Sequence, residues 1–427
     1  MVNERRARTD RGERRSPIGF VIVVAVFSAL SAISAISAPP ESIEARAARV
    51  QREAIVIDTH IDTTGHLQRS GWQFTGRHDP SDGHVDLPRM KDGGVTGAFF
   101  AIDGLDQVKG PEILEPSLAG LDALRSLAEQ MPDKVMLCLT AADVRRAKQS
   151  GKIAMLIGLE GGHLIHDSLA TLRSYARLGA RYMTLTHFVN TSWADSSGEP
   201  PAHNGLTDFG RQVVQEMNRL GVIVDISHVS DKTFYDALET STAPVFASHS
   251  SCRVLASHVR NMSDDMIKAL AAKGGVIQIN FHAPYLDDAY MEAQQRLQPE
   301  VDALRKELEV RYPGPENGGK RAEELRTFQA ARLPKVSWMR IVEHIDHAVK
   351  LVGADHVGIG SDMDGAVMPE GMEDCSHLPR ITEELLRRGY SEADVKKILG
   401  GNTLRLMEQV EATATRLRAK AATNSSQ

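Results

Sequence analysis

Cysteine is scarce in this chain, which has only three (Cys138, Cys252 and Cys375) in 427 residues. Three thiols are too few for a disulfide framework, and they form no Cys-x-x-Cys pair, so a thiolate zinc site is not expected. A Gly-x-Gly-x-x-Gly motif is also missing after the first strand-like segment, which argues against a dinucleotide-binding fold. Stability must therefore come from an apolar core, which a chain of this length can readily build.

Positive charge is in short supply beyond the first 15 residues. The whole chain has 50 Lys and Arg against 56 Asp and Glu, a net charge of −6; residues 1–15 hold six Arg and three acidic residues, so the remainder carries −9. Nucleic-acid binding needs Lys and Arg surfaces, so we expect no nucleic-acid partner. The hydrophobic (42%) and charged (25%) fractions are those of an ordinary globular protein, which excludes wholesale disorder and a polytopic membrane protein.

The first 38 residues have the features of a targeting segment. Their Arg cluster precedes an uncharged run over residues 16–40, with an apolar centre (GFVIVVAVFSAL) followed by the small residues SAISAISA. A basic head, an apolar middle and a small-residue end are typical of a signal peptide. The run is also long enough to span a bilayer, so an N-terminal membrane anchor is the alternative. In both cases we expect the protein to be exported, either periplasmic or membrane-anchored and facing outside the cytoplasm.

Eight short segments rich in apolar and β-branched residues recur through the rest of the chain. They are AIVIDTHID (54–62), VTGAFFAID (95–103), KIAMLIGLE (152–160), ARYMTLTHF (180–188), GVIVDISHV (221–229), APVFASHSS (243–251), GGVIQINF (274–281) and HVGIGSDMD (356–364). Helix-like stretches lie between them, and Gly179, Gly221 and Gly274 stand just before the apolar residues of three segments, where helix C-caps fall. Alternating strands and helices predict a parallel sheet, and eight such units predict an α/β fold of the closed (β/α)8 TIM-barrel type.

We expect one barrel domain over residues 39–415 and a disordered tail over residues 416–427. A densely charged segment, residues 283–335, interrupts the βα pattern between the seventh and eighth strands. It is predicted to be a helical insertion that is broken near Pro313-Gly314-Pro315. A solvated helical hairpin is the simpler interpretation, and a lid or a partner surface is the alternative.

Six of the eight predicted strands end in histidine or carboxylate side chains. These are His60 and Asp62 on the first strand, Glu160 on the third, His187 on the fourth, His228 on the fifth, His249 on the sixth, and Asp362 and Asp364 on the eighth. A barrel places its reactive groups at the C-terminal ends of its strands. A single histidine at a strand end is more often structural than a ligand, but independent structural histidines would not be expected to share one rim.

Imidazole and carboxylate groups are ordinary ligands for zinc and similar divalent ions. A Glu among three His and an Asp suits a carboxylate that bridges two ions. Two ions about 3.5–4 Å apart can bind one hydroxide and lower its pKa toward neutrality. The rim therefore predicts a metal-dependent hydrolase.

Seven stretches of the sequence resemble the membrane (renal) dipeptidases, the zinc peptidases of family M19. They are DTHID (58–62), GLEGGH (158–163), RYMTLTHFVNTSWADS (181–196), VDISHVSDKTF (224–234), PVFASHSSCR (244–253), VRNMSDD (259–265) and GIGSDMDG (358–365). They follow the family's order with similar spacing over roughly residues 52–410. The His-x-Asp pair followed by LTH, Asn and WAD is a specific combination.

The resemblance implies a role for each residue of the site. His60 and Asp62 would bind one Zn²⁺, His228 and His249 a second, and Glu160 would bridge both. His187 would stabilise the tetrahedral oxyanion, Asp362 would handle the proton of the hydroxide, and Arg260 would hold the terminal carboxylate of the substrate. Tyr285 would lie near that carboxylate.

The resemblance also implies a homodimer that hydrolyses dipeptides, some with a D-residue at the C-terminal position, through a hydroxide bridging two zinc ions. Two other functions are compatible with a metal-binding barrel. One is another metallohydrolase, acting on lactones or phosphoesters or deaminating bases, and the second is a non-catalytic envelope binding protein. The His-x-Asp pair and the Arg260 segment argue against the first, and the complete ligand set argues against the second.

Overall fold

The architecture was obtained as a computed structural model, which describes residues 41–103, 106, 108, 110–314 and 317–425. The predicted targeting segment at 1–38 lies outside these residues. Of the described helices, none combines the length and the hydrophobicity needed to cross a membrane.

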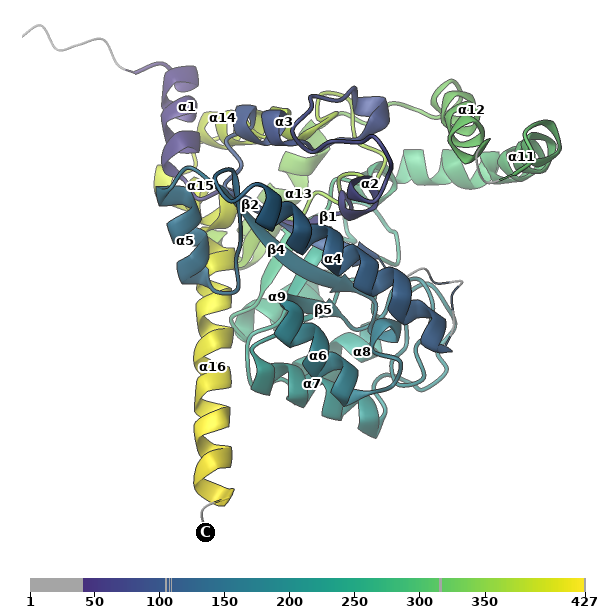
Figure 1. Cartoon of the computed structure of the whole chain (residues 1–427). Coiled ribbons are helices and arrows are strands. Elements are labelled where there is room, and N and C mark those ends of the chain that lie inside the picture. Colours follow the sequence, from purple (N-terminus) through teal and green to yellow (C-terminus); the bar gives the residue numbers. More distant parts are fainter. Residues whose placement is uncertain (1–40, 104–105, 107, 109, 315–316, 426–427) are drawn as a thin grey trace, which may run out of the picture. The chain divides into compact units, whose positions relative to one another are not determined.

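The described residues contain one parallel sheet whose strands form a nearly closed barrel (Figure 1). Its strands are β1 (Ile57–Ile61), β2 (Gly97–Asp103), β4 (Ile153–Glu160), β5 (Ala180–Thr184), β6 (Ile223–Asp225), β7 (Phe246–Ser250), β8 (Val276–Ile279) and β9 (Val357–Ile359). They are hydrogen-bonded in that order, and all eight predicted strands are confirmed. Just beyond β9, the N–H of Asp362 donates to the carbonyl of His60 and the N–H of Asp62 to that of Met363, which joins the two ends of the sheet at the rim.

One short strand was not predicted. β3 (Val135–Leu137) pairs only with β4 and lies off the barrel path. Its three residues pair with one neighbouring strand, β4. A segment this short has too little periodicity to be recognised from the sequence.

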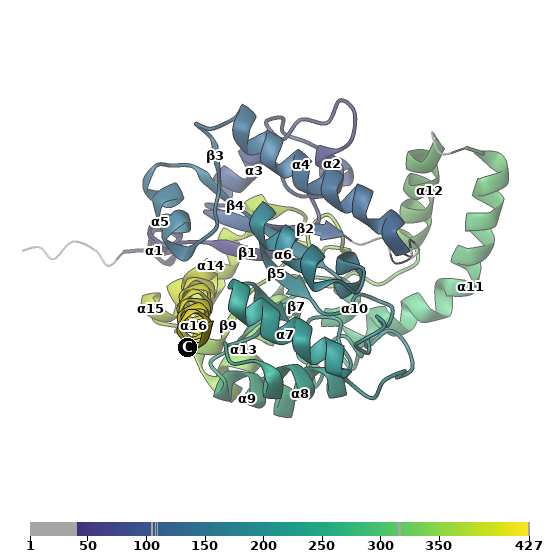
Figure 2. The same cartoon turned by 60° about the horizontal axis from the view of Figure 1, so that its bottom comes forward.

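Helices cover the outside of the barrel, as Figure 2 shows. The longer ones are α1 (Ile43–Glu53), α3 (Leu87–Asp92), α4 (Leu114–Gln130), α5 (Ala141–Gln149), α6 (Leu169–Leu178), α7 (Asp208–Leu220), α8 (Asp231–Thr240), α9 (Asp264–Ala272), α13 (Met339–Val352), α14 (Pro379–Arg387) and α16 (Asn402–Ser425). The shorter ones are α2 (Thr64–Leu67), α10 (Ala283–Leu286) and α15 (Glu392–Lys396). The hydroxyls of Ser230 and Ser263 cap the N-termini of α8 and α9, and Gly221 ends α7 in the left-handed conformation.

The charged segment after β8 contains two helices, α11 (Asp288–Arg311) and α12 (Gly318–Ala330), which lie beside each other at one side of the barrel (Figure 2). None of the residues of α12 is buried. The guanidinium of Arg311 joins the two helices through a 2.9 Å bond to Glu324. A pocket of about 590 Å³ lies between this pair of helices and the loops that follow β1 and β9. It is lined by residues such as Tyr290, Arg326 and His84.

The end of the chain differs from the prediction. Residues 416–425, expected to be disordered, continue α16 as far as Ser425. Residues 411–422 are mostly Ala, Arg, Leu, Lys and Thr, and the first four favour helix, so the helix extends beyond the part that packs on the barrel. The last two residues of the predicted tail lie outside the described part of the chain.

The interior of the barrel is filled by aromatic side chains below the rim. Phe99, Tyr182 and Phe246 are fully buried, and their ring centroids lie 5.2–6.4 Å apart. The ring of Tyr182 occupies the space beside Gly158, where a Cβ atom would come within 2.4 Å of it. This layer separates the apolar base of the barrel from the polar rim above it.

Candidate metal centre

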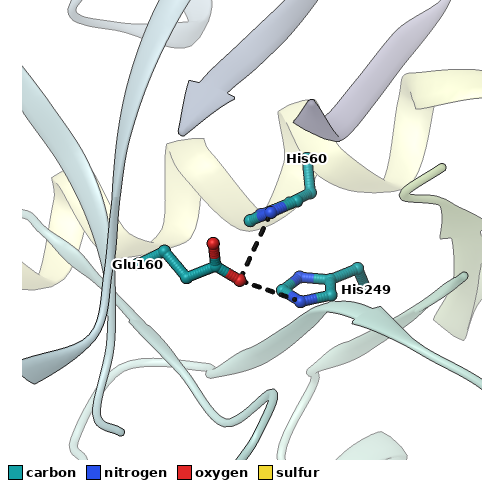
Figure 3. A group of neighbouring side chains, drawn as sticks. All are labelled: His60, Glu160 and His249. Carbon is teal, nitrogen blue, oxygen red and sulfur yellow. Dashed lines mark ion pairs between the residues drawn. The ribbon is translucent and has the colours of Figure 1, made fainter. Parts of the chain in front are cut away.

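Three imidazoles converge on one carboxylate oxygen at the C-terminal rim of the barrel. The Oε1 atom of Glu160 lies 3.4 Å from Nε2 of His60, 3.2 Å from Nε2 of His228 and 3.3 Å from Nε2 of His249. Figure 3 shows the carboxylate of Glu160 between the rings of His60 and His249. Glu160 is the last residue of β4, and the three histidines lie in or just after β1, β6 and β7. The predicted bridging residue therefore lies at the centre of its predicted partners.

Two further carboxylates, after β1 and after β9, extend this cluster. Nε2 of His60 lies 3.5 Å from Oδ1 of Asp62 and 4.0 Å from Oδ1 of Asp362. The groups that could hold an ion form three overlapping triplets, in each of which the ligand atoms lie within 4.8 Å of one another. The triplets are His60–Glu160–His249, Glu160–His187–His228 and His60–Asp62–Asp362. His60 and Glu160 each belong to two of these triplets, so the triplets form one continuous group of candidate ligands.

The hydrogen bonding of the imidazoles fits metal ligation. Nδ1 of His60 is 2.7 Å from the hydroxyl of Tyr182, and Nδ1 of His249 is 2.7 Å from that of Ser248, which in turn donates to Asp225. These outer partners orient the rings so that both Nε2 atoms face Glu160, as second partners of ligating histidines do. Nε2 of His60 and Oδ1 of Asp62 are buried without a hydrogen-bond partner among the described residues. Buried polar atoms rarely stay unsatisfied, so these atoms are suited to a cation.

The protonation and backbone of the rim agree with this arrangement. Burial lowers the pKa of His228 and of His249, which keeps both imidazoles in the neutral, ligating form. Their Nε2 atoms lie only 2.9 Å apart, a separation that a shared cation would also accommodate. His228 (φ 66°) and Asp362 (φ 63°) adopt the left-handed backbone conformation. Non-glycine residues in that conformation are characteristic of functional sites.

His187 lies beside the cluster and is held by a residue that was not predicted. Its Nδ1 atom is 3.0 Å from Oδ2 of Asp106, and its Nε2 atom is 3.7 Å from Oε1 of Glu160. Burial opposes a charge on His187, but Glu160 and Asp106 outweigh it and raise the pKa of His187 to about 9. Asp106 is therefore placed to orient the ring so that Nε2 faces the centre.

Asp362 faces the same centre from the β9 side. Its Oδ2 atom accepts a 2.9 Å hydrogen bond from the amide of Asn280. Burial and the negative charge of Asp62 raise the pKa of Asp362 to about 7. A carboxyl group with a pKa near neutrality can both accept and donate a proton at physiological pH.

Arg260 does not line the pocket that contains most of the other predicted residues. Its side chain is buried, donates 3.1 Å to the carbonyl of His249 and lies 3.4 Å from the hydroxyl of Ser250. Its guanidinium carbon is 5.4 Å from the ring centroid of Tyr285. Tyr285 lines the pocket above the cluster of histidines and carboxylates, called the rim pocket below. Burial raises the pKa of Tyr285 to about 12, so its hydroxyl keeps its proton. Arg260 thus lies behind Tyr285 and against a predicted metal ligand, and its Nε has no hydrogen-bond partner among the described residues.

A pocket of about 490 Å³ opens over this centre. Its polar wall includes Asp62, Asp103, Glu160, His187, His228, His282, Tyr285, Asp362 and Asp364, and its apolar wall includes Ala101, Ile102, Pro116 and Phe188. The pocket is large enough for a small ligand such as a dipeptide.

Sequence reasoning missed several residues of this site. Asp103 ends the second predicted strand, so the strand-end rule applied to the other residues could have found it. Tyr182 and Asn280 lie in or just after apolar strands, and no spacing in the sequence reveals their contacts with His60 and Asp362. Asp106 lies in a loop, where the sequence gives no indication of direction.

Comparisons with known proteins identify the family of the chain. A family model for membrane dipeptidase (peptidase family M19) matches residues 44–421. The probable dipeptidase PvdM of Pseudomonas aeruginosa is 29% identical, with a TM-score of 0.74, and the match covers 88% of this chain and all of that one. A metallo peptidase of Rhodobacter sphaeroides, solved with a phosphinate mimic of L-Ala-D-Ala, is 26% identical, with a TM-score of 0.69, and the match covers 84% of this chain and 99% of that one. The chain therefore belongs to the membrane dipeptidase family, peptidase family M19, and is a metallo-dipeptidase.

Proposed function

We propose that this protein is a zinc dipeptidase with a binuclear centre, which cleaves the peptide bond of dipeptides, including those with a D-residue at the C-terminal position. The observation that carries the proposal is the convergence of three Nε2 atoms on Oε1 of Glu160 within 3.4 Å. Cleavage of dipeptides with a C-terminal D-residue is supported by the relative that was solved with a mimic of L-Ala-D-Ala.

In this proposal His60 and Asp62 hold one ion, His228 and His249 hold the other, and Glu160 is shared between them. When bound, two zinc ions supply Lewis acidity toward the peptide carbonyl and activate water at neutral pH. The chain itself orients these ligands: Tyr182 and Ser248 fix the rings of His60 and His249 through their Nδ1 atoms.

The remaining residues act on the substrate and on protons. Asp362, with its pKa near 7, takes a proton from the attacking water and passes it to the leaving amine. His187, held by Asp106, donates from Nε2 to the oxygen that becomes negative in the transition state, where such stabilisation accelerates the reaction. Tyr285 and Arg260 bind the carboxylate of the substrate, a charge-assisted interaction that favours a free C-terminus.

Export and dimer formation also remain proposals. Export depends only on the Arg-rich and apolar pattern of residues 1–38, and the homodimer only on the resemblance to the family.

Dipeptide turnover tests the proposed activity directly. The purified full-length protein is expected to hydrolyse members of an L-Xaa–Gly and L-Xaa–D-Ala panel when zinc is present, to lose activity with a chelator and to regain it when zinc is restored. No turnover of any member with zinc bound would contradict the dipeptidase assignment. Turnover of L-Xaa–Gly but not of L-Xaa–D-Ala would contradict only the cleavage of dipeptides with a C-terminal D-residue.

Replacement of Arg260 tests the carboxylate site. Arg260→Ala should raise KM for dipeptides about 10- to 100-fold, because a charge-assisted bond to the substrate is lost. Since Arg260 also bonds the carbonyl of His249, zinc content must be measured for the same variant. An unchanged KM, or a loss of activity explained by lost zinc, would remove the carboxylate role.

A further inference from the structure

One acidic side chain in the rim pocket has no partner. Asp103 is the last residue of β2, and the strand register places it directly beside Glu160 of β4. It lines the pocket and is solvent-exposed, yet it makes no hydrogen bond or ion pair with any other described residue. The metal-ligand triplets do not include it.

The other acidic residues that line the pocket are all engaged. Glu160 and Asp62 face imidazoles, Asp362 accepts from Asn280, and Asp364 accepts from Thr63. A free carboxylate in this position is suited to a cation that arrives with the substrate.

The strand order places Asp103 opposite the predicted carboxylate site. In the order β1-β2-β4-β5-β6-β7-β8-β9, strand β7 lies four positions from β2 in either direction around the ring. Arg260 lies in the loop that follows β7, and Tyr285 follows β8. Asp103 and the proposed carboxylate site therefore belong to opposite sides of the ring of strands, and Asp103 and Tyr285 both line the same pocket.

We propose that Asp103 binds the free α-ammonium group of the dipeptide. This inference rests on the proposed dipeptidase function and deepens it. A substrate whose carboxylate lies at Arg260 and Tyr285, and whose peptide bond lies over Glu160, extends its amino end toward β2. Two metal cations repel an ammonium group, so a local carboxylate is needed to hold it there. Recognition of both charged ends also explains a restriction to dipeptides, because a longer peptide has no ammonium group at that distance.

The test compares a dipeptide with its hydroxyl analogue. L-Ala–Gly carries the ammonium group, and L-lactoyl–Gly carries a hydroxyl in its place. Steady-state kinetics of both compounds are measured for wild type, Asp103→Asn and Asp103→Ala in the full-length enzyme, with competitive inhibition constants where turnover is too slow. Asp265→Asn serves as the control, since that carboxylate is exposed on α9.

For L-Ala–Gly we expect both Asp103 variants to lose about 10- to 100-fold in kcat/KM, mostly through KM, because a charge-assisted bond to the substrate is removed. For L-lactoyl–Gly the change should stay below about 3-fold. Zinc content should equal that of wild type, which separates ammonium binding from a role in the metal site. The Asp265 variant should behave as wild type does with both compounds.

Three results would overturn the inference: equal losses for the two compounds, loss of zinc from the Asp103 variants, or a loss confined to dipeptides with a Lys or Arg side chain at the first position. If the wild-type enzyme hydrolyses no dipeptide, the proposed function fails and the role of Asp103 fails with it. If wild type is active and the ratio of the two compounds is unchanged in the variants, only the assignment of Asp103 fails.

Discussion

The amino and carboxyl ends of the barrel strands differ in the side chains they bury: mainly apolar at the amino ends, and histidine and carboxylate at the carboxyl ends. At the amino ends, Ile57, Val276 and Leu406 belong to a dry cluster in which α16 packs against the strands. At the carboxyl ends, only a few residues further along the same strands, His60 and Asp62 carry buried polar atoms without hydrogen-bond partners among the described residues. The comparison indicates that the base provides stability through apolar packing, while the rim gathers unpaired imidazole and carboxylate atoms that suit a bound cation.

Tyr182 marks the boundary between these regions. Its ring packs between Phe99 and Phe246 in the apolar layer, while its hydroxyl lies 2.7 Å from Nδ1 of His60. A single side chain thus connects the packing of the base to the orientation of a metal ligand. Substitutions above, below and at this boundary should therefore have separable effects.

The largest effect on activity is expected at the rim. His249→Ala should reduce kcat/KM by about 10³-fold, because the lost ligand removes several kcal/mol of transition-state stabilisation. The measurement is dipeptide kinetics together with zinc analysis. His356→Ala is the matched control, since His356 lies just before β9 at the amino end of the barrel and its ring lies 2.8 Å from the carbonyl of Gly275. Wild-type activity in the His249 variant, or an equal loss in the control, would contradict the division between the two ends.

A substitution at the base should give the reverse pattern. Leu406→Ala removes a fully buried side chain and should lower the free energy of unfolding by about 3 kcal/mol, measured by urea denaturation. Zinc content and kcat of the folded enzyme should stay unchanged. Val310→Ala, at a position with 84% exposure on α11, should change stability by less than about 0.5 kcal/mol. Loss of zinc in the folded Leu406 variant would show that the two ends are coupled.

The smallest effect is expected at the boundary. Tyr182→Phe keeps the ring and removes only the hydroxyl, so zinc affinity should fall about 10- to 100-fold. The free energy of unfolding of the chelated protein should fall by about 1 kcal/mol. Tyr175→Phe is the control, because that hydroxyl bonds Ser117 away from the rim. It should show a similar change in stability and no change in zinc affinity; equal affinities in both variants would remove the link through Tyr182.

The barrel was predictable because strands covered on both faces have a strong apolar signature. The rim could be predicted for a related reason: in a parallel barrel every strand ends at the same side, so the strand ends alone bring Glu160 near His60 and His249. That rule locates neighbours but not atoms, and it did not reveal that all three imidazoles face a single oxygen of Glu160.

What escaped prediction depends on long-range packing. The burial of Arg260 against His249 and the contact of Asp106 with His187 follow from loop paths that leave no periodic signal in the sequence. The helical end of α16 was missed for another reason, since the polar residues at the very end of the chain obscured the helix-forming residues before them.

The metal content of the Glu160→Ala variant tests the central claim most directly, because a single carboxylate is proposed to serve both ions. Elemental analysis of the wild-type protein purified with zinc should give about two ions per chain, and the Glu160→Ala variant, still folded by circular dichroism, should retain almost none. A folded variant that keeps both ions would contradict the account.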